Sequence, residues 1–499
     1  MGHPSGDRAF FGHPRGLSTL FFTEMWERFS YYGMRALLLL YMTAPLSAGG
    51  LGFDAAQGGA VYGLYTSMVY MACLPGGWVA DRLIGQRKAV LYGGILISSG
   101  HFSMAVPSIV TFYLGLFLIV IGTGLLKGNV SVIVGKLYAA EDKRRDAGFS
   151  IFYMGINLGA FIAPLVCGYL GQTINWHLGF GDAGVGMALG VVQYVLGSRR
   201  LGDAGMAPAP TASPAAAARD RRTAITWGLI GAGLALVIGG GGYTGLLPVT
   251  PTQISDGAGV FLLLSTVGFF AWLFFSSGWT PDEKRRLYVI GVLFLAAALF
   301  WSVFEQAGST LNLFADRSTD TRMLGMSFPS SWFQSLNSLF LIILAPVFAW
   351  VWATLAAQGR EPTSPAKFAL GLVFAGLGFA VLIGPAARAE QGTLASPFWL
   401  TLTYLLHTIG ELALSPVGLS AMTRLAPSRI AGLVMGVWFL ATSVGNFIGG
   451  RVSGFYESFA LPSLFGVITA FAIVAGLILA AFVGPMRRLA PPSTTADRS

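Results

Sequence analysis

The chain has 499 residues, of which 54% are hydrophobic and only 11% are charged. Soluble domains carry about 25% charged residues, so this composition excludes an ordinary soluble protein and predicts an all-α polytopic membrane protein. The net charge of +9 lies mostly in the segments that alternate with apolar runs on one predicted side of the membrane, and it therefore gives no separate basis for nucleic-acid binding. Cys73 and Cys167 both lie in apolar runs, which does not favour a disulfide framework.

Apolar runs long enough to cross a bilayer, about 20 residues each, recur along the whole chain. We expect the first run to be retained rather than cleaved as a signal peptide, because it carries charges and many more follow it. The fourteen predicted spans are 17–42, 57–80, 88–106, 109–137, 145–170, 179–198, 223–242, 258–277, 286–314, 327–356, 366–384, 396–424, 429–455 and 460–486.

The basic residues predict the orientation of these spans. Lys and Arg are concentrated in alternate connecting segments, together with both ends of the chain. The opposite segments receive only Arg317, Arg322 and Arg388. Because cytoplasmic loops carry the excess of positive charge, we expect both termini to be cytoplasmic.

The Ala/Pro-rich and then basic segment DAGMAPAPTASPAAAARDRR predicts a linker between two groups of spans. Two spans after it have uncharged interiors and look like accessory helices. The remainder is two bundles of six, an arrangement typical of carriers with a site near the membrane midplane. The predicted parts are a cytoplasmic N-terminus (1–16), an N-terminal six-helix bundle (17–198), a cytoplasmic linker (199–222), two accessory transmembrane helices with a loop (223–285), a C-terminal six-helix bundle (286–487) and a cytoplasmic tail (488–499).

The first span contains charges that a lipid-facing helix would not tolerate. Each charge at mid-helix costs about 2.5–3.5 kcal/mol on the insertion scales. At about 100° per residue the polar side chains share one face of the helix, which must then face protein or water. This stripe, which first suggests a transporter, consists of Glu24, Glu27, Arg28, Tyr31 and Arg35.

The predicted cytoplasmic loop GGWVADRLIGQRK places Asp81 and Arg82 beside a basic cluster and glycine. It resembles the loop motif of the major facilitator superfamily. Charges at such a position can form ion pairs that hold one conformation and break in another, so we assign gating to Asp81 and Arg82. The alternative is simple positive-inside anchoring, for which Asp81 is not needed.

Several motifs together resemble one family, the proton-dependent oligopeptide transporters of bacterial type. They are ExxERFxYYG at 24–33, GTGLLKGNVS at 122–131, FYMGINLGAFIAP at 152–164, FWSVFEQAG at 300–308 and GELALSPVGLS at 410–420. The resemblance implies a major facilitator fold and proton-coupled import of di- and tripeptides by alternating access. One departure is Gly128 after Lys127, where many members have proline.

The family resemblance implies roles for residues of the N-terminal bundle. Lys127 needs a carboxylate nearby, and the family pairs this lysine with the ExxER motif, so Glu24, Glu27, Arg28 and Lys127 are expected to couple protons. Arg35 and Lys127, with Asn157, would hold the peptide carboxylate through charge-assisted hydrogen bonds. Tyr31 and Tyr70 would supply hydroxyls and ring surface. An inert salt bridge for Lys127, and interfacial anchoring for Tyr70, are the alternatives.

In the C-terminal bundle, Glu305 is expected to be a proton site. Withdrawal from water favours the neutral form of a carboxyl group, so such a group can gain and release a proton. Trp301, one turn earlier, forms an apolar wall beside it and lines the substrate site. The alternative for Glu305 is a hydrogen-bonded core carboxylic acid.

The resemblance also implies that Glu411, with Asn337, meets the ammonium group of the peptide. Ser415 follows one turn later and is assigned to the substrate site. Pro416 should kink or weaken the helix there and is assigned to gating. Trp438 either lines a side-chain pocket or packs in the bundle.

The sequence therefore predicts a symporter of the bacterial inner membrane that is not an enzyme and functions as a monomer. Its partners would be di- and tripeptides, peptide-like drugs, protons and the lipid bilayer. No cofactor besides the coupling proton and no metal site is expected, because no His/Cys/Asp cluster or phosphate loop occurs. His407 is expected to be a satisfied buried histidine, and membership of a proton relay with Glu411 is the alternative. A proton/drug antiporter of the same fold and an intramembrane peptide hydrolase remain alternatives.

Overall fold

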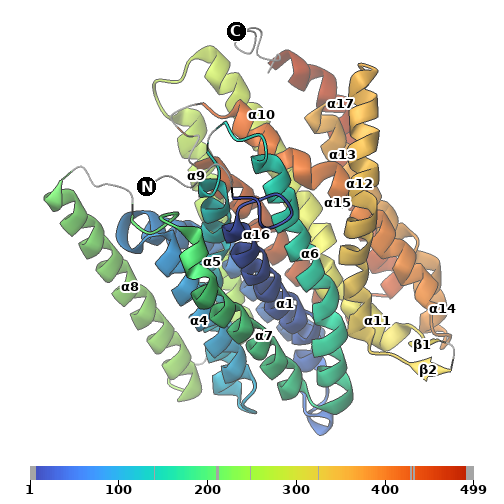
Figure 1. Ribbon diagram of the computed structural model, residues 1–499. Helices are drawn as coiled ribbons and strands as arrows, with labels where there is room; N and C mark the ends of the chain where they lie inside the picture. Colours follow the sequence, from blue (N-terminus) through green and yellow to red (C-terminus); the bar gives the residue numbers. More distant parts are fainter. Residues whose placement is uncertain are drawn as a thin grey trace. The chain divides into compact units, whose positions relative to one another are not determined.

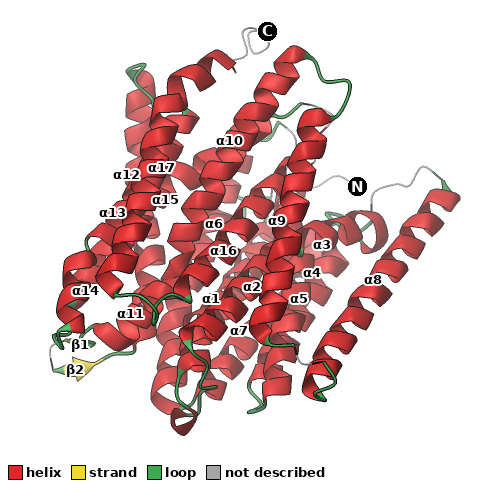
Figure 2. Ribbon diagram, turned by 180° about the vertical axis from the view of Figure 1, so that it is seen from behind, coloured by secondary structure: helices red, strands yellow, loops and turns green. Residues whose placement is uncertain are grey.

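The computed structural model describes residues 7–139, 141–208, 213–247, 249–323, 325–427, 430 and 433–489. Within these ranges the chain is almost entirely helical (Figure 2), as predicted. The exception is a short antiparallel hairpin of β1 (Arg322–Met323) and β2 (Met326–Ser327).

The helices can be followed along the chain by colour in Figure 1. They are α1 (Arg15–Thr43), α2 (Ala55–Met71), α3 (Cys73–Val79), α4 (Gln86–Met104), α5 (Ile109–Lys136), α6 (Arg145–Tyr169), α7 (Trp176–Gly197), α8 (Pro214–Tyr243), α9 (Pro251–Phe275), α10 (Pro281–Phe304), α11 (Thr310–Ser318), α12 (Ser335–Ala357), α13 (Ser364–Ala380), α14 (Ile383–Glu390), α15 (Pro397–Leu425), α16 (Val434–Ser453) and α17 (Leu461–Leu489).

Every predicted span coincides with one or two of these helices. Within the described residues, ten helices are long and apolar enough to cross a membrane. The remaining predicted spans fall on α1, on α2 with α3, on α4 and on α16. Helix α1 contains the charged stripe. Helix α2 ends at Met71, so the predicted span 57–80 is made of two helices, α2 and α3.

The chain divides into two compact units. Unit 1 comprises Met1–Leu51 and Met68–Asp256, and unit 2 comprises Gly52–Ser67 and Gly257–Ser499. Residues 55–67, most of α2, thus belong to unit 2, although their sequence lies within the predicted N-terminal bundle. The predicted accessory helices also divide, since α8 falls in unit 1 and α9 lies mostly in unit 2.

Unit 1 is packed through glycines on neighbouring helices. A Cβ atom added at Gly93 of α4 would lie 2.6 Å from the carbonyl oxygen of Gly122 on α5. An added Cβ at Gly100 would lie 2.7 Å from the carbonyl oxygen of Gly115. Small residues let membrane helices approach closely, and these glycines fix α4 against α5.

The predicted linker, 199–222, is partly helical. Ser213 caps α8 by accepting a hydrogen bond from the backbone N–H of Ala216 at 3.2 Å, and Pro214 occupies the first turn. The alanines that follow have the highest helix propensity, which explains why α8 begins inside the expected linker. Leu201 and Ala204, at the other end of the linker, are buried in the core of unit 1.

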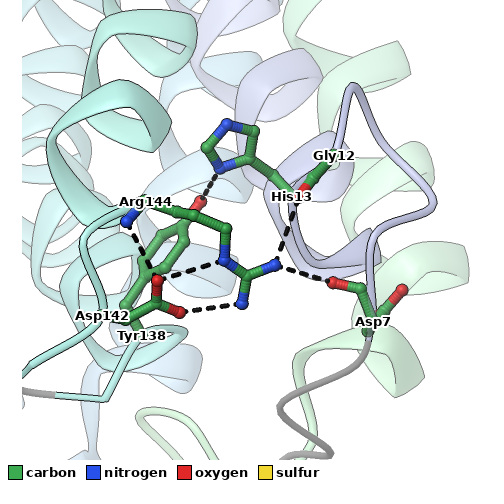
Figure 3. Close-up of polar contacts among 6 residues, drawn as sticks. All are labelled: Asp7, Gly12, His13, Tyr138, Asp142 and Arg144. Atoms are coloured by element: carbon green, nitrogen blue, oxygen red, sulfur yellow. Dashed lines mark hydrogen bonds and ion pairs between the residues drawn. The ribbon is translucent and has the colours of Figure 1, made fainter.

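The segment before α1 is tied to the connection between α5 and α6 (Figure 3). The Arg144 guanidinium donates to the Asp142 carboxylate at 2.8 and 3.1 Å and to the backbone carbonyl of Gly12 at 3.2 Å. The Nδ1 atom of His13 lies 2.9 Å from the Tyr138 hydroxyl. Hydrogen bonds from the side chain and backbone of Arg144 lower the pKa of Asp142 to about 2.

Unit 2 brings α10, α12, α15 and α16 into contact around the predicted site residues. The start of α10 is well defined, because Thr280 and Glu283 form a reciprocal capping box before Pro281. On α16, a Cβ added at Gly445 would lie 2.6 Å from the Cβ of Trp301. This close approach holds α10 and α16 side by side.

Candidate functional site

The charged stripe of α1 is buried inside unit 1, as the sequence predicts. Glu24, Glu27, Arg28 and Arg35 are each at most 4% exposed. Arg28 forms an ion pair with Glu27, and its Nε lies 3.3 Å from Oε1 of Glu24. Two carboxylates therefore share one guanidinium.

This sharing leaves acceptor capacity within the described structure. Oε2 of Glu24 and Oε1 of Glu27 have no hydrogen-bond partner among the described residues. A buried carboxylate oxygen without a partner is costly, and a proton relieves that cost by removing the charge. The arrangement can therefore take up a proton without a new partner residue.

Lys127 differs from the expectation of a carboxylate partner. Its Nζ lies 3.7 Å from the centre of the Tyr70 ring and 5.9 Å from that of Tyr31. In the described part of the chain no carboxylate oxygen lies within 4.0 Å of it. The physical reason is that Arg28 already pairs with both acids, so that ring faces hold the ammonium through cation–π attraction.

The other predicted carboxylate-binding residues lie on α1 and α6. Arg35 lies 5.6 Å from the centre of the Tyr32 ring. The Asn157 amide donates to the carbonyl of Tyr153, one turn earlier on α6, at 3.1 Å. Asn157 is half-buried, and its described hydrogen bond lies within its own helix rather than to Arg35 or Lys127.

In unit 2 the structure brings Glu411 and Asn337 together, although 74 residues separate them. The Asn337 amide on α12 donates to Oε2 of Glu411 on α15 at 2.9 Å and to the Thr408 hydroxyl at 3.1 Å. Thr408 was not expected, although its position one turn before Glu411 could have suggested it. The amide orients a half-buried carboxylate that can accept from a cationic ligand.

Three aromatic side chains of the predicted site region lie on α10 and α16 of unit 2. The rings of Trp301 and Trp438 are 6.4 Å apart and edge-on, and Phe304 lies 5.4 Å from Trp301. Trp438 is 9% exposed, so it packs in the bundle, and only a small part of it can line a pocket. Glu305 follows Phe304 directly and is buried.

The remaining predicted residues of α15 occupy different environments. Ser415 is half-buried, whereas Pro416 is exposed and lies within a continuous α15. His407 is buried, and its Nε2 lies 3.0 Å from the carbonyl oxygen of Ala375. The histidine is therefore buried as expected, but it is only partly satisfied, because its Nδ1 has no hydrogen-bond partner among the described residues.

The gating loop forms two sets of contacts within unit 1. Asp81 accepts a hydrogen bond from the Gln86 amide at 2.6 Å, and Lys136 donates to the other atom of that amide at 3.0 Å. Arg82 lies 4.0 Å from Asp220 on α8. Gln86 therefore connects Asp81 to α5, a role that its uncharged side chain did not suggest.

These buried ion pairs and carboxylates, held within apolar helices, define a polytopic membrane transporter. Three or more His, Cys, Asp or Glu residues do not gather as a possible metal site anywhere in the described ranges. The model of the POT family matches residues 87–216 and 264–470. The chain belongs to the POT family, and it is a transporter rather than an enzyme.

Similar proteins support this assignment along nearly the whole chain. Transporter YclF of Bacillus subtilis (strain 168) is 45% identical over 95% of this chain and 94% of its own length. Peptide transporter YePEPT of Yersinia enterocolitica subsp. palearctica serotype O:3 (strain YE-P4) is 41% identical over 97% and 96%. The crystal structure of peptide transporter POT in complex with sulfate matches with a TM-score of 0.89 and 45% identity, covering 96% of each chain.

Proposed function

We propose that the chain is a proton-coupled symporter that imports di- and tripeptides by alternating access. The observation that carries the proposal is the division of charge between the units. Buried Arg35 and half-buried Lys127 lie in unit 1, and the Asn337-bound carboxylate of Glu411 lies in unit 2. A free peptide ends in a carboxylate and an ammonium group, so each unit offers the complement of one end.

Broad specificity follows from this chemistry. The cations bind the carboxylate through charge-assisted hydrogen bonds, and Glu411 binds the ammonium. Side chains would meet aromatic surface such as Tyr70 and Trp301, which favours contact without demanding one shape. Peptide-like drugs that keep both end charges would bind as well.

Proton coupling would use the shared carboxylates of α1 and Glu305. Glu24 and Glu27 have spare acceptor oxygens, and a proton on either changes the charge around Arg28 and Lys127. Protonation can then bias which side of the carrier is open. The proton is the only coupling species in this proposal, without a further cofactor.

The proposal includes placement in the bacterial inner membrane with both termini cytoplasmic, and function as a monomer. The positive-inside distribution supports the orientation. We call the membrane side opposite the termini the outer side. The connection from α1 to α2 and the connection from α16 to α17 then both face outward.

The test is a binding cycle on purified protein with three ligands: free dialanine, its C-terminal amide and its N-acetyl form. Arg35→Ala should weaken free dialanine and N-acetyl dialanine by roughly 10- to 150-fold, the value of a charge-assisted contact of about 1.5–3 kcal/mol. It should hardly change the already poor binding of the amide, which has no carboxylate. Glu411→Gln should weaken free dialanine and the amide but spare the N-acetyl form.

Arg285→Ala is the matched control, since it removes an exposed guanidinium at the start of α10. We expect it to change none of the three affinities. Equal losses for all ligands in both site variants would show general damage and contradict end recognition. If Arg35→Ala spared the N-acetyl form instead, the peptide would bind in the opposite direction.

One observation favours a second candidate, a proton/drug antiporter of the same fold. The Trp301 and Phe304 rings, close to Glu305 in the chain, and the Trp438 ring beside Trp301 would suit an apolar cation. Uptake of labelled dialanine into vesicles under an inward proton gradient separates the two, because an antiporter would not accumulate it. Recovery of intact dialanine from the same vesicles would exclude peptide hydrolysis.

A further inference from the structure

Glu457, in the connection between α16 and α17, joins segments that are far apart in the sequence. Its Oε1 accepts a hydrogen bond from the Arg317 guanidinium at 2.6 Å, and its Oε2 accepts one from the backbone N–H of Ala55 at 3.0 Å. Arg317 lies at the end of α11, and Ala55 is the first residue of α2. One carboxylate therefore holds three elements of unit 2 together.

The chemistry of this contact is specific. The first N–H groups of a helix have no partner within the helix, and an acid near them is favourable. Asp54 accepts from the N–H of Gln57 at 2.7 Å, which leaves the N–H of Ala55 to Glu457. The Arg317 guanidinium lies 5.8 Å from the centre of the buried Tyr456 ring, which restricts its position.

Below this contact, residues 59–67 of α2 pack tightly on α16. A Cβ added at Gly59 would lie 2.6 Å from the carbonyl oxygen of Gly450. The hydroxyls of Ser67 and Ser443 are 2.8 Å apart, and both side chains are fully buried. The Asn446 amide donates to the Thr66 carbonyl at 3.2 Å. Ser67 is also the last residue of α2 in unit 2, and unit 1 begins again at Met68.

We infer that Glu457 is a positioning residue of the transport cycle, a latch that holds the outer end of α2 on α11 and α16 and is released when the carrier opens outward. The inference rests on the proposed function and orientation. A carrier with alternating access must separate helices on each side in turn. Helix α2 has residues 55–67 in unit 2 and residues 68–71 in unit 1, so it connects the two units, and contacts at its outer end must change during that motion.

The latch acts at a distance from the proposed peptide and proton sites. It needs no titration during the cycle, because an ion pair and a hydrogen bond can break by separation alone. Loss of the latch would raise the population of the outward-open state. A larger binding-competent population lowers the apparent dissociation constant for peptide from outside, while the return step becomes slower.

The first experiment measures access from the outer side without peptide or a proton gradient. Ala60, next to Gly59, is fully buried, and Ala60→Cys provides a probe for a membrane-impermeant maleimide added to right-side-out vesicles. The reaction of the two buried native cysteines is measured in the parent chain and subtracted. We expect Glu457→Gln to raise the probe's labelling rate by about two- to fivefold, the value of one partly exposed ion pair.

Asp320→Asn is the matched control. The Asp320 carboxylate also accepts from one backbone N–H and one guanidinium, at 3.0 and 3.2 Å, but both belong to Arg322, two residues away. It therefore joins no distant elements, and its loss should leave labelling unchanged. An unchanged rate in Glu457→Gln, or an equal rise in Asp320→Asn, would overturn the latch.

Arg317 provides a second route if Glu457→Gln fails to fold. Arg317→Gln should raise labelling as Glu457→Gln does, whereas Arg317→Lys should keep the parent rate.

Uptake assays give an independent readout. Loss of the latch should lower the KM and the maximal rate together, while simple damage would lower the amount of active protein at constant KM. An increase in KM would contradict the latch. Failure of peptide binding by the parent protein would instead contradict the proposed function. The labelling experiment uses no peptide, so its result would still test the latch.

Discussion

At the scale of single residues, His13 makes the attachment of the N-terminal segment sensitive to pH. Burial, and the nearby positive charge of Arg144, lower the pKa of His13 below its usual 6.5. The folded attachment therefore favours neutral histidine, whereas the released segment binds the proton at its usual pKa. Attachment is fully present above about pH 6.5 and weakens as the pH falls towards the lowered pKa.

We therefore predict that residues 7–13 exchange their amide hydrogens faster as the pH falls from 7.5 to 5.5, after correction for intrinsic rates. Asp142 remains ionised in this range, because its pKa is about 2, and it cannot cause the change. His13→Gln should remove the pH dependence. A dependence that persists in His13→Gln would contradict the assignment to His13.

At the scale of elements, the contact between α2 and α16 depends on the absence of side chains. A methyl group at Gly59 would lie 2.6 Å from both the Gly450 carbonyl oxygen and the Ser453 hydroxyl oxygen. The carbonyl oxygen is a backbone atom and cannot move without shifting α16. The Ser453 hydroxyl could rotate away only by losing its hydrogen bond to the Gly450 carbonyl at 2.7 Å. We predict that Gly59→Ala destabilises the protein by about 1–3 kcal/mol, the usual cost of overpacking.

Thermal unfolding in detergent checks this prediction. Gly466→Ala in α17 is the control, because nothing lies within 4 Å of a Cβ added there. Alanine is the better helix former by roughly 0.5–1 kcal/mol, so the control should be neutral or slightly stabilising. If both variants lost stability equally, the loss could not be assigned to the contact of α2 with α16.

At the scale of the whole molecule, coupling requires that proton and peptide movements depend on one another. Glu305→Gln keeps the shape of a buried side chain but cannot carry a proton. We predict that it reduces gradient-driven uptake by at least about tenfold, within the usual range of coupling energies. Peptide counterflow needs no net proton movement and should remain.

The control for this prediction is Glu361→Gln, which removes a carboxylate paired with Lys367 at 2.6 Å in the connection before α13. It should change neither uptake nor counterflow. Unchanged gradient-driven uptake in Glu305→Gln would remove Glu305 from the coupling mechanism.

Much of this architecture could be predicted from the sequence, because charged side chains inside apolar spans must face the protein interior or water. The burial of Glu24, Glu27 and Arg28 follows from the cost of exposing them to lipid. The partner of Lys127 could not be derived in this way, since two acids and Arg28 allow several pairings and only packing selects the Tyr70 ring. The role of Glu457 could not be predicted, because no sequence motif surrounds it. Its partner Arg317 was one of the three basic residues predicted on the outer side.

The division of α2 between the units also has a consequence for biosynthesis. Ala55 and Glu457 are 402 residues apart, so at about 5–20 residues per second the ribosome needs roughly 20–80 s to make the second after the first. During that time the buried polar groups of Thr66 and Ser67 lack their partners on α16. Until α16 is made, this part of α2 must contact lipid or other protein segments instead. A chain truncated before α16 would leave α2 without its native packing.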